Sequence, residues 1–268
     1  LVDGALTLDS GSVELNPKGN ALFFAIDVRP NAWSAGGDFT TTFTMNGGTV
    51  SMDGKSEDAI RLAVNSSDTF TNAKVSAVMN GGTISGWSGF FIQQLNSTYR
   101  PIKLTINAGT IDGNKAAIRT YGGVMESYVG PEGVTPISIT INDGSFSSNK
   151  ETGAETDIAV ATGTANQTKV SVSGGTFSKK VPKSQCAEGF TSKANEDGTY
   201  SIVPKSVIAK IGDTEYKDLD KALLAAAAST GDVTVDIIAD IDLGGEEWPD
   251  ISVNAGKTPV GTVTVNGN

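Results

Sequence analysis

The chain has 268 residues, and its hydrophobic content of 38% can supply the core of one large or two modest domains. Its 30 acidic residues exceed its 20 basic ones, and the net charge of −10 disfavours nucleic acid and anionic membrane surfaces as partners. The sequence has no histidine and one cysteine, Cys186, which excludes an internal disulfide and the usual catalytic base. Its longest apolar run, residues 222–228, is too short to cross a bilayer, so we expect no membrane insertion.

A short phrase recurs along the first two thirds of the chain. It reads MNGGTV at residues 45–50 and returns as MNGGTI, INAGTI, INDGSF and VSGGTF. The glycines that align are Gly11, Gly48, Gly82, Gly109, Gly144 and Gly175, separated by 37, 34, 27, 35 and 31 residues. A period of this length is typical of stacked repeats in a solenoid.

The residues around the aligned glycine predict a strand, a turn and a second strand. Apolar residues lie three positions before it (Leu8, Met45, Met79, Ile106, Ile141, Val172) and two positions after it (Val13, Val50, Ile84, Ile111, Phe146, Phe177). Short polar residues precede it by two positions (Asp9, Asn46, Asn80, Asn107, Asn142, Ser173), and hydroxyl residues follow it (Ser12, Thr49, Thr83, Thr110, Ser145, Thr176). If the repeats stack, each of these columns becomes a row of touching side chains.

Further apolar segments follow in most repeats, at residues 21–28, 59–64, 89–94, 116–121 and 157–162. Strand, glycine turn, strand and loop at about thirty residues a cycle predict an all-β, right-handed parallel β-helix of the pectin-lyase-like kind with six coils. Propeller blades are longer, and leucine-rich horseshoes need leucine signatures that the chain lacks.

The pattern changes after the last repeat, and we predict three parts. Residues 1–185 form the β-helix, residues 186–204 a capping hairpin with Asp197 and Gly198 in its turn, and residues 205–268 the start of a second β-helix unit. Cys186 is interpreted as a buried apolar residue of the cap. In the last part, a helix over about residues 219–228 should bury Leu219, Ala222, Leu223 and Ala226, and a strand is expected at residues 233–241. Since Val263, Val265, Asn266 and Gly267 repeat the phrase, and residues 1–10 show no secretion signal, we expect a piece of a longer tandem array.

These motifs carry a resemblance to a known family. The INGGTF-like repeats, the segment CAEGFTSKANEDGTYSIV and the unit AKIGDTEYKDLDKALLAAA…GDVTVDIIADI resemble the β-helix regions of adhesin-like surface proteins from gut-dwelling Gram-positive bacteria. The resemblance implies secretion and attachment at the cell wall. Some relatives in that family are immunoglobulin-binding superantigens that grip antibody variable domains, so it also permits immunoglobulin as a partner.

The sequence signals for catalytic residues are weak. Asp236, Asp240 and Asp242 could hold calcium or act as a glycosidase pair, but their even spacing is typical of the solvent side of a strand. Arg61, Arg100 and Arg119 have no acidic cluster beside them in sequence and are interpreted as solvated surface arginines. The hydroxyl columns raise an ice-binding face as an alternative, which the irregular neighbouring rows disfavour. We therefore predict no catalysis, no cofactor and no metal.

The predicted binding site is one flank of the solenoid, where the loops that leave the stacked strands gather. Aromatic and arginine side chains are concentrated in these segments, at Trp33, Tyr99, Arg100, Arg119, Tyr121 and Tyr128. Such residues carry much of the binding energy at interfaces, although each could instead cover the core beneath its own loop. We expect a monomeric extracellular binding module for a host protein, with immunoglobulin favoured, or for a host glycan. The alternatives are a polysaccharide-degrading enzyme of the β-helix class and a passive stalk.

Overall fold

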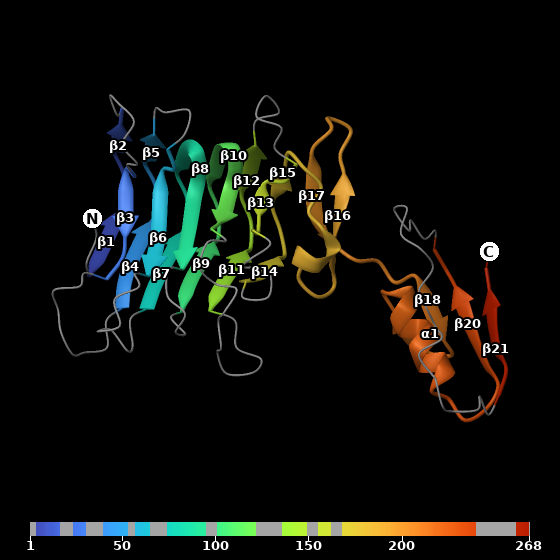
Figure 1. Ribbon diagram of the computed structural model, residues 1–268. Coiled ribbons are helices and arrows are strands. Elements are labelled where there is room, and N and C mark those ends of the chain that lie inside the picture. Colours follow the sequence, from blue (N-terminus) through green and yellow to red (C-terminus); the bar gives the residue numbers. More distant parts are fainter. Residues whose placement is uncertain are drawn as a thin grey trace. The chain divides into compact units, whose positions relative to one another are not determined.

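The computed structural model confirms the predicted fold class, a right-handed parallel β-helix that turns about an axis roughly perpendicular to its strands (Figure 1). The structure describes residues 4–16, 24–30, 40–52, 57–64, 74–94, 101–121, 136–148, 155–161, 168–239 and 261–267. The contacts within the chain divide it into two compact units, Leu1–Val203 and Pro204–Asn268. The finer division at residue 185 stays a prediction.

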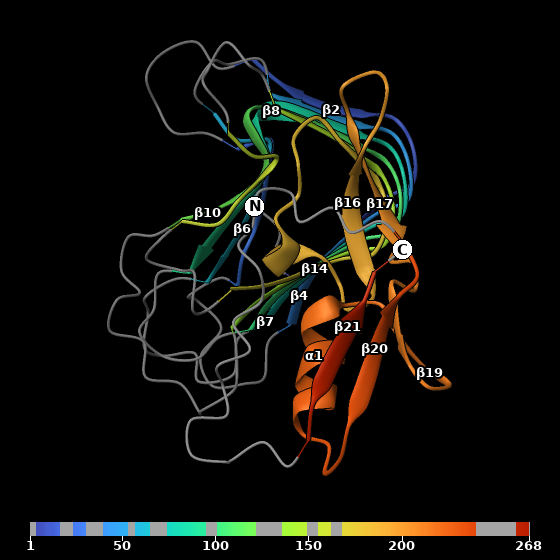
Figure 2. The same cartoon turned by 90° about the vertical axis from the view of Figure 1, so that its right-hand side faces the viewer.

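The first sheet of unit 1 contains the strand that precedes each glycine turn. Its six strands are all parallel, in the order β1 (Ala5–Leu8), β4 (Thr40–Met45), β7 (Lys74–Met79), β9 (Ile102–Ile106), β11 (Ile137–Ile141) and β14 (Thr168–Val172). The apolar column aligns in register through every pair, from Leu8 opposite Met45 to Ile141 opposite Val172. Figure 2 shows these strands stacked behind one another.

The second sheet follows the glycine turns. Its parallel strands are β2 (Ser12–Leu15), β5 (Thr49–Met52), β8 (Thr83–Gln94), β10 (Thr110–Thr120), β12 (Ser145–Ser148) and β15 (Thr176–Phe177). The predicted hydroxyl column is confirmed, because Ser12, Thr49, Thr83, Thr110, Ser145 and Thr176 are successive partners across these strands.

The third face of the solenoid is formed by β3 (Ile26–Val28), β6 (Ile60–Val64), the later parts of β8 and β10, and β13 (Ile158–Ala159). Strands β8 and β10 run continuously from the second sheet into this face, and their pairing shifts register between Gly113 and Ala116. A Cβ at Gly113 would lie 1.9 Å from the carbonyl oxygen of Ala116, so the bend requires a glycine there. Five turns therefore carry strands on all three sides.

The corner between the first and second sheets is called here the glycine corner, and it is built from the repeated Asn-Gly phrase. At Gly82 the backbone has a φ of +90°, and a Cβ would lie 2.7 Å from the carbonyl oxygen of Gly48 in the preceding turn. Both the left-handed conformation and the close stacking of turns therefore demand glycine.

An asparagine ladder runs along this corner. The Nδ2 amides of Asn46, Asn80, Asn107 and Asn142 donate to the Oδ1 atoms of Asp9, Asn46, Asn80 and Asn107 respectively, at 2.7, 2.8, 2.7 and 2.7 Å. The predicted stacking of these residues in adjacent turns is thereby confirmed. Each bond contributes about 1 kcal/mol net, because the exposed amides exchange water for one another.

The core of unit 1 is a column of aliphatic and phenylalanine side chains from all three faces. Phe43, Phe90, Phe146 and Phe177 are almost wholly buried, and the rings of Phe146 and Phe177 stack with centroids 4.6 Å apart and an interplanar angle of 9°. This separation matches the spacing of adjacent strands, so identical residues at the repeat positions stack face to face.

The predicted hairpin caps the last turn of the solenoid. Strands β16 (Phe190–Ala194) and β17 (Tyr200–Pro204) are neighbours, and β17 pairs antiparallel with β15, which covers the edge of the second sheet. The 3-10 helix η4 (Lys183–Gln185) precedes the hairpin. Cys186 is half-buried rather than buried: it packs against the core, and its backbone bridges Val172 of β14.

Unit 2 contains a four-stranded sheet and the predicted helix. The strand order is β19 (Thr214–Tyr216), β18 (Ala209–Ile211), β20 (Val233–Ile237) and β21 (Val263–Asn266). Helix α1 (Leu219–Ala227) buries Leu219, Ala222, Leu223 and Ala226, the four residues predicted. Strand β20 is shorter than predicted, and it pairs parallel with β21, as the repeated phrase indicates.

Candidate functional site

Two of the six predicted binding residues, Arg119 and Tyr121, lie where the structure describes the chain. Arg119 lies near the end of β10 on the third face of the solenoid, and Tyr121 follows the last residue of that strand. The other four, Trp33, Tyr99, Arg100 and Tyr128, lie outside the described residues. The third face is therefore the part of the predicted flank whose geometry can be described.

The outward row of the third face consists of unlike residues. Asp27, Arg61, Phe91, Arg119 and Ala159 are successive partners from β3 to β13. Side chains one strand apart on the same side of a sheet are in contact distance, so this row places acid, guanidinium and aromatic ring side by side. The glycine corner, in contrast, stacks like on like.

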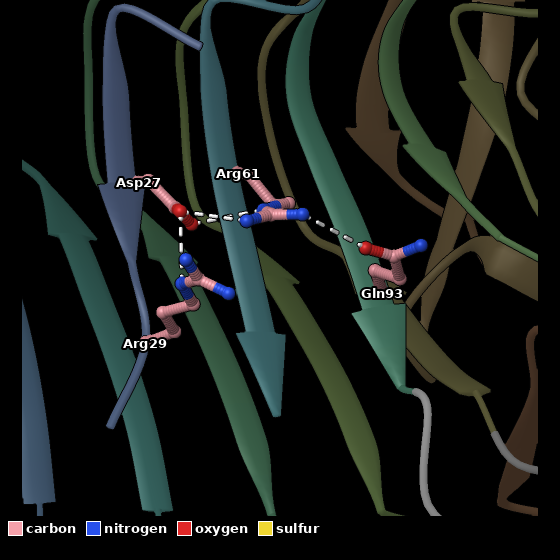
Figure 3. Close-up of polar contacts among 4 residues, drawn as sticks. All are labelled: Asp27, Arg29, Arg61 and Gln93. Carbon is pink, nitrogen blue, oxygen red and sulfur yellow. Dashed lines mark hydrogen bonds and ion pairs between the residues drawn. The ribbon is translucent and has the colours of Figure 1, made fainter. Parts of the chain in front are cut away.

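Asp27 is the centre of the first charged group in the row (Figure 3). Arg61 donates to both its carboxylate oxygens, from Nε at 2.9 Å and from Nη2 at 2.6 Å, and Arg29 Nε lies 3.0 Å from Oδ2. The remaining Nη1 of Arg61 donates to Gln93 Oε1 at 3.3 Å. This two-pronged arrangement fixes the guanidinium plane and joins three neighbouring strands.

Arg119 makes a second group of the same kind. Its Nε and Nη2 donate to the two carboxylate oxygens of Asp58 at 3.1 and 2.6 Å. The side chain of Asp58 is only 5% exposed and that of Arg119 is 26% exposed. The guanidinium also lies over the ring of Phe91, 4.0 Å from its centroid, as that of Arg61 lies over Phe24 at 4.3 Å.

The interpretation of Arg61 and Arg119 as solvated surface arginines is wrong, because both side chains are largely covered and paired with carboxylates. Their carboxylate partners, Asp27 and Asp58, are 34 and 61 residues away in sequence, and the stacking of turns brings them together. A search along the chain for adjacent acidic residues cannot find such pairs. Alignment of the later apolar segments would have placed Asp27 opposite Arg61, because both follow the first isoleucine of their strands.

An aromatic group lies beside the arginines. Phe91 stacks with Phe24 at a centroid distance of 6.1 Å and meets Tyr121 edge to face at 5.9 Å. Phe91 is 6% exposed, whereas Tyr121 is 40% exposed. Tyr121 thus presents part of its ring to solvent while its inner edge is fixed by Phe91.

The third face carries most of the arginines of the chain. Three of the four arginines in the sequence, Arg29, Arg61 and Arg119, lie on it, and each is paired with the carboxylate of Asp27 or Asp58. The face therefore concentrates guanidinium groups whose charge is balanced by the carboxylates beside them.

Asp157 was not predicted as a special residue, yet it is buried at the last turns of the solenoid. Its carboxylate accepts from Ser148 Oγ at 2.6 Å, from Ser178 Oγ at 2.8 Å and from the backbone N–H of Lys179 at 2.9 Å. Three donors satisfy a buried carboxylate, so Asp157 joins adjacent turns as Asp27 does, whereas the pair of Asp58 with Arg119 spans two turns.

The acidic residues proposed as a calcium or glycosidase site fall partly outside the description. Asp236 is exposed and accepts from Asn266 Nδ2 at 3.0 Å, while Asp240 and Asp242 lie outside the described residues. Among the residues whose placement is described, no group of three or more Cys, Asp or Glu is arranged to hold a metal ion.

Comparisons with models of protein families, with curated proteins and with solved structures found no match to this chain. Within the described parts of the chain, no helix combines the length and the apolar character that crossing a membrane requires.

Proposed function

We propose that the chain is a non-catalytic binding module of a bacterial surface protein, displayed outside the cell, and that it grips a host partner through the third face. The observation that carries this proposal is the clustering of arginine and aromatic side chains on one side of a solenoid whose other described rows are mostly Ser, Thr and Asn. Arginine and tyrosine are the residue types that dominate binding energy at protein interfaces.

The preorganisation of these side chains supports the same proposal. Bidentate ion pairs and ring stacking fix Arg61 and Arg119 before any partner arrives, so binding would cost little side-chain entropy. The exposed part of Tyr121 offers an aromatic surface for a protein side chain or a sugar ring. An antibody variable domain is the protein partner we favour, and a host glycan is the second choice.

Three carboxylates of unit 1 support binding more than hydrolysis. Polysaccharide hydrolysis needs one carboxyl group that can donate a proton and another that meets substrate or water. The buried or half-buried Asp27, Asp58 and Asp157 are each engaged by two or more strong donors that join the turns of the solenoid.

A passive stalk is the second candidate, and the asparagine ladder favours it. The ladder and the cross-turn ion pairs stiffen the stack along its axis, which a spacer requires as much as a binding rod does. A stalk needs no exposed aromatic residue, however, so Tyr121 separates the two functions.

The test is binding of the full chain to immobilised antibody Fv and Fc fragments, followed by capture from serum and a glycan array. We expect Tyr121→Ala to weaken binding at least about tenfold, the typical size of an interface hot spot. The matched control is Lys103→Ala, an exposed substitution on β9 in the first sheet, which should leave binding unchanged. Equal affinity of both variants would remove the third face from the proposal, and absence of any ligand would favour the stalk.

A further inference from the structure

Both units contain the same two-strand phrase. Residues 4–9 read Gly-Ala-Leu-Thr-Leu-Asp, and residues 231–236 read Gly-Asp-Val-Thr-Val-Asp. The next strand of each unit reads Thr-Phe-Thr-Met-Asn at residues 42–46 and Thr-Val-Thr-Val-Asn at residues 262–266. In both places the first segment ends in aspartate and the second segment ends in asparagine.

The structure gives these two phrases the same pairing. Leu6 is opposite Phe43 in β1 and β4, as Val233 is opposite Val263 in β20 and β21. The asparagine of the second strand donates to the aspartate of the first in both units, at 2.7 Å from Asn46 to Asp9 and at 3.0 Å from Asn266 to Asp236. Strand β1 is therefore the counterpart of β20.

The other edge of β20 is covered by the preceding part of unit 2. Strand β18 pairs antiparallel with it, and the apolar side of α1 packs against Val235, which is fully buried. Together β18, β19 and α1 form a module, called here the ββα module, that closes both the strand edge and the apolar end of the sheet.

The same edge of β1 is bare in the part of the chain that the structure describes. Strand β1 is the last strand of its sheet, and Leu6, whose counterpart Val233 is half-buried, is 38% exposed. Leu8, the counterpart of the buried Val235, is only half-buried. An unpaired edge beside an apolar end is a surface that a further strand and an apolar helix would cover.

The register of β18 also places a basic residue beside the phrase. Lys210 of β18 is the strand partner of Asp236 in β20, although its ammonium group pairs with Glu215 of β19 at 2.9 Å. Asp9, the counterpart of Asp236, is exposed, so a lysine in the same place would lie opposite a second carboxylate. In unit 2 the glycine that opens the phrase, Gly231, follows soon after α1, so Gly4 stands where a preceding helix would end.

We propose that the outer edge of β1, with Leu6, Leu8 and Asp9, is the docking site of a ββα module like β18–β19–α1, supplied by the same polypeptide immediately before Gly4. The partner pairs antiparallel with β1, places a lysine opposite Asp9 and lays a helix over Leu6 and Leu8. Each solenoid then carries a ββα module in front of its first turn. This inference does not depend on the proposed binding function.

The experiment replaces residues 1–3 by residues 204–230, so that the graft directly precedes Gly4, and measures backbone amide hydrogen exchange. In the ungrafted chain, we expect the amides of β1 to exchange faster than those of β20. In the chimera, exchange in β1 should slow at least about tenfold and approach that of β20, because closed edges open only with larger parts of the fold. Protection in β9, in the middle of the rod, reports in the same data that unit 1 is folded.

The matched control carries Leu219→Asp and Leu223→Asp in the grafted copy alone, which removes the apolar side of the helix. It should return β1 to its fast exchange, and Lys210→Glu in the graft should return it in part. Unchanged exchange of β1 in the chimera, with β9 still protected, would overturn the proposal, as would loss of protection in β9. Concentration-dependent protection of β1 in the ungrafted chain would also overturn it, since a second copy would then be the occupant.

Discussion

Neighbouring turns of the solenoid are held together in different ways at the glycine corner and on the third face. At the corner, identical side chains stack, and each Asn amide both donates and accepts along one line. On the third face, unlike side chains alternate, and Asp27 binds Arg61 while Arg119 lies over Phe91. At the corner, one repeated residue type is enough to link the turns, because an Asn amide can both donate and accept a hydrogen bond. On the third face, a charged side chain needs a neighbour of opposite charge or an aromatic ring.

The largest effect is expected from a methyl group at the corner. In Gly82→Ala, the new Cβ would meet Met45 Cε and the carbonyl oxygen of Gly48 in a left-handed backbone, and we expect a loss of about 3 to 4 kcal/mol. Urea unfolding measures the loss. The control is Gly198→Ala in the cap hairpin, where φ is +83° but nothing lies within 4 Å of the new Cβ. It should cost about 1 kcal/mol, and equal losses would show that crowding between turns is unimportant.

The next effect is expected on the third face. Arg119→Ala leaves the buried carboxylate of Asp58 without its bidentate partner, and we expect a loss of about 2 to 3 kcal/mol because Arg119 is partly exposed. Arg29→Ala is the control, since Asp27 keeps both bonds from Arg61, and its cost should stay below about 1 kcal/mol. If the two variants unfold at the same urea concentration, the ion pairs do not hold the third face together.

A smaller effect is expected in the ladder. Asn80→Asp removes the donor to Asn46 and brings two acceptor oxygens together, which should cost about 1 to 2 kcal/mol near pH 7. Asp9→Asn, at the start of the ladder, keeps the acceptor that Asn46 uses and should change stability by less than about 0.5 kcal/mol. Thermal unfolding measures the change in Tm of each variant. Equal changes in Tm would contradict the donor-to-acceptor direction of the ladder.

The smallest effect concerns the cap hairpin. The hydroxyl and backbone N–H of Thr199 donate to Asp197 and hold the pKa of that carboxyl below its ordinary value of 3.8. Because the folded pKa is lowered, the stabilising contribution is complete above the unfolded pKa and is lost as pH falls through the folded one. Titration of the Asp197 carboxyl by NMR should show this shift, and Thr199→Val should move the pKa back towards 3.8. An unshifted pKa in the parent chain would contradict the turn geometry.

The parts of the fold that repetition encodes could be predicted from the sequence. The ladder residues, the hydroxyl column and the two apolar columns were assigned to adjacent turns because the same residue type returns at each period. The helix with Leu219, Ala222, Leu223 and Ala226 was predicted because its apolar spacing is local. Strand β20 ends at Ile237 instead of Ile241, since alternation marks which residues face the core but not where pairing stops.

The candidate site could be predicted only in part. The residue types of Arg119 and Tyr121 predict interface residues, and the structure places both on the third face. The partners of the arginines could not be found, because Asp27 and Asp58 reach them across turns from non-repeating positions. The contact of Phe91 could not be predicted for the same reason. Its own strand indicates only an apolar core residue, and the guanidinium over its ring comes from Arg119 on the neighbouring strand.

The direction of the asparagine ladder gives the rod an electrical polarity. Every amide in it turns its N–H towards the start of the chain and its carbonyl towards the cap, so the side-chain dipoles add along the axis. The carboxylate of Asp9 lies at the positive end of this row, as an acidic residue does at the beginning of an α-helix. Unit 2 repeats the device with Asp236 and Asn266. The aspartate at the N-terminal end of the ladder thus places a negative charge at the positive end of the dipoles. Because a carboxylate can only accept, it also fixes the direction in which every later amide donates.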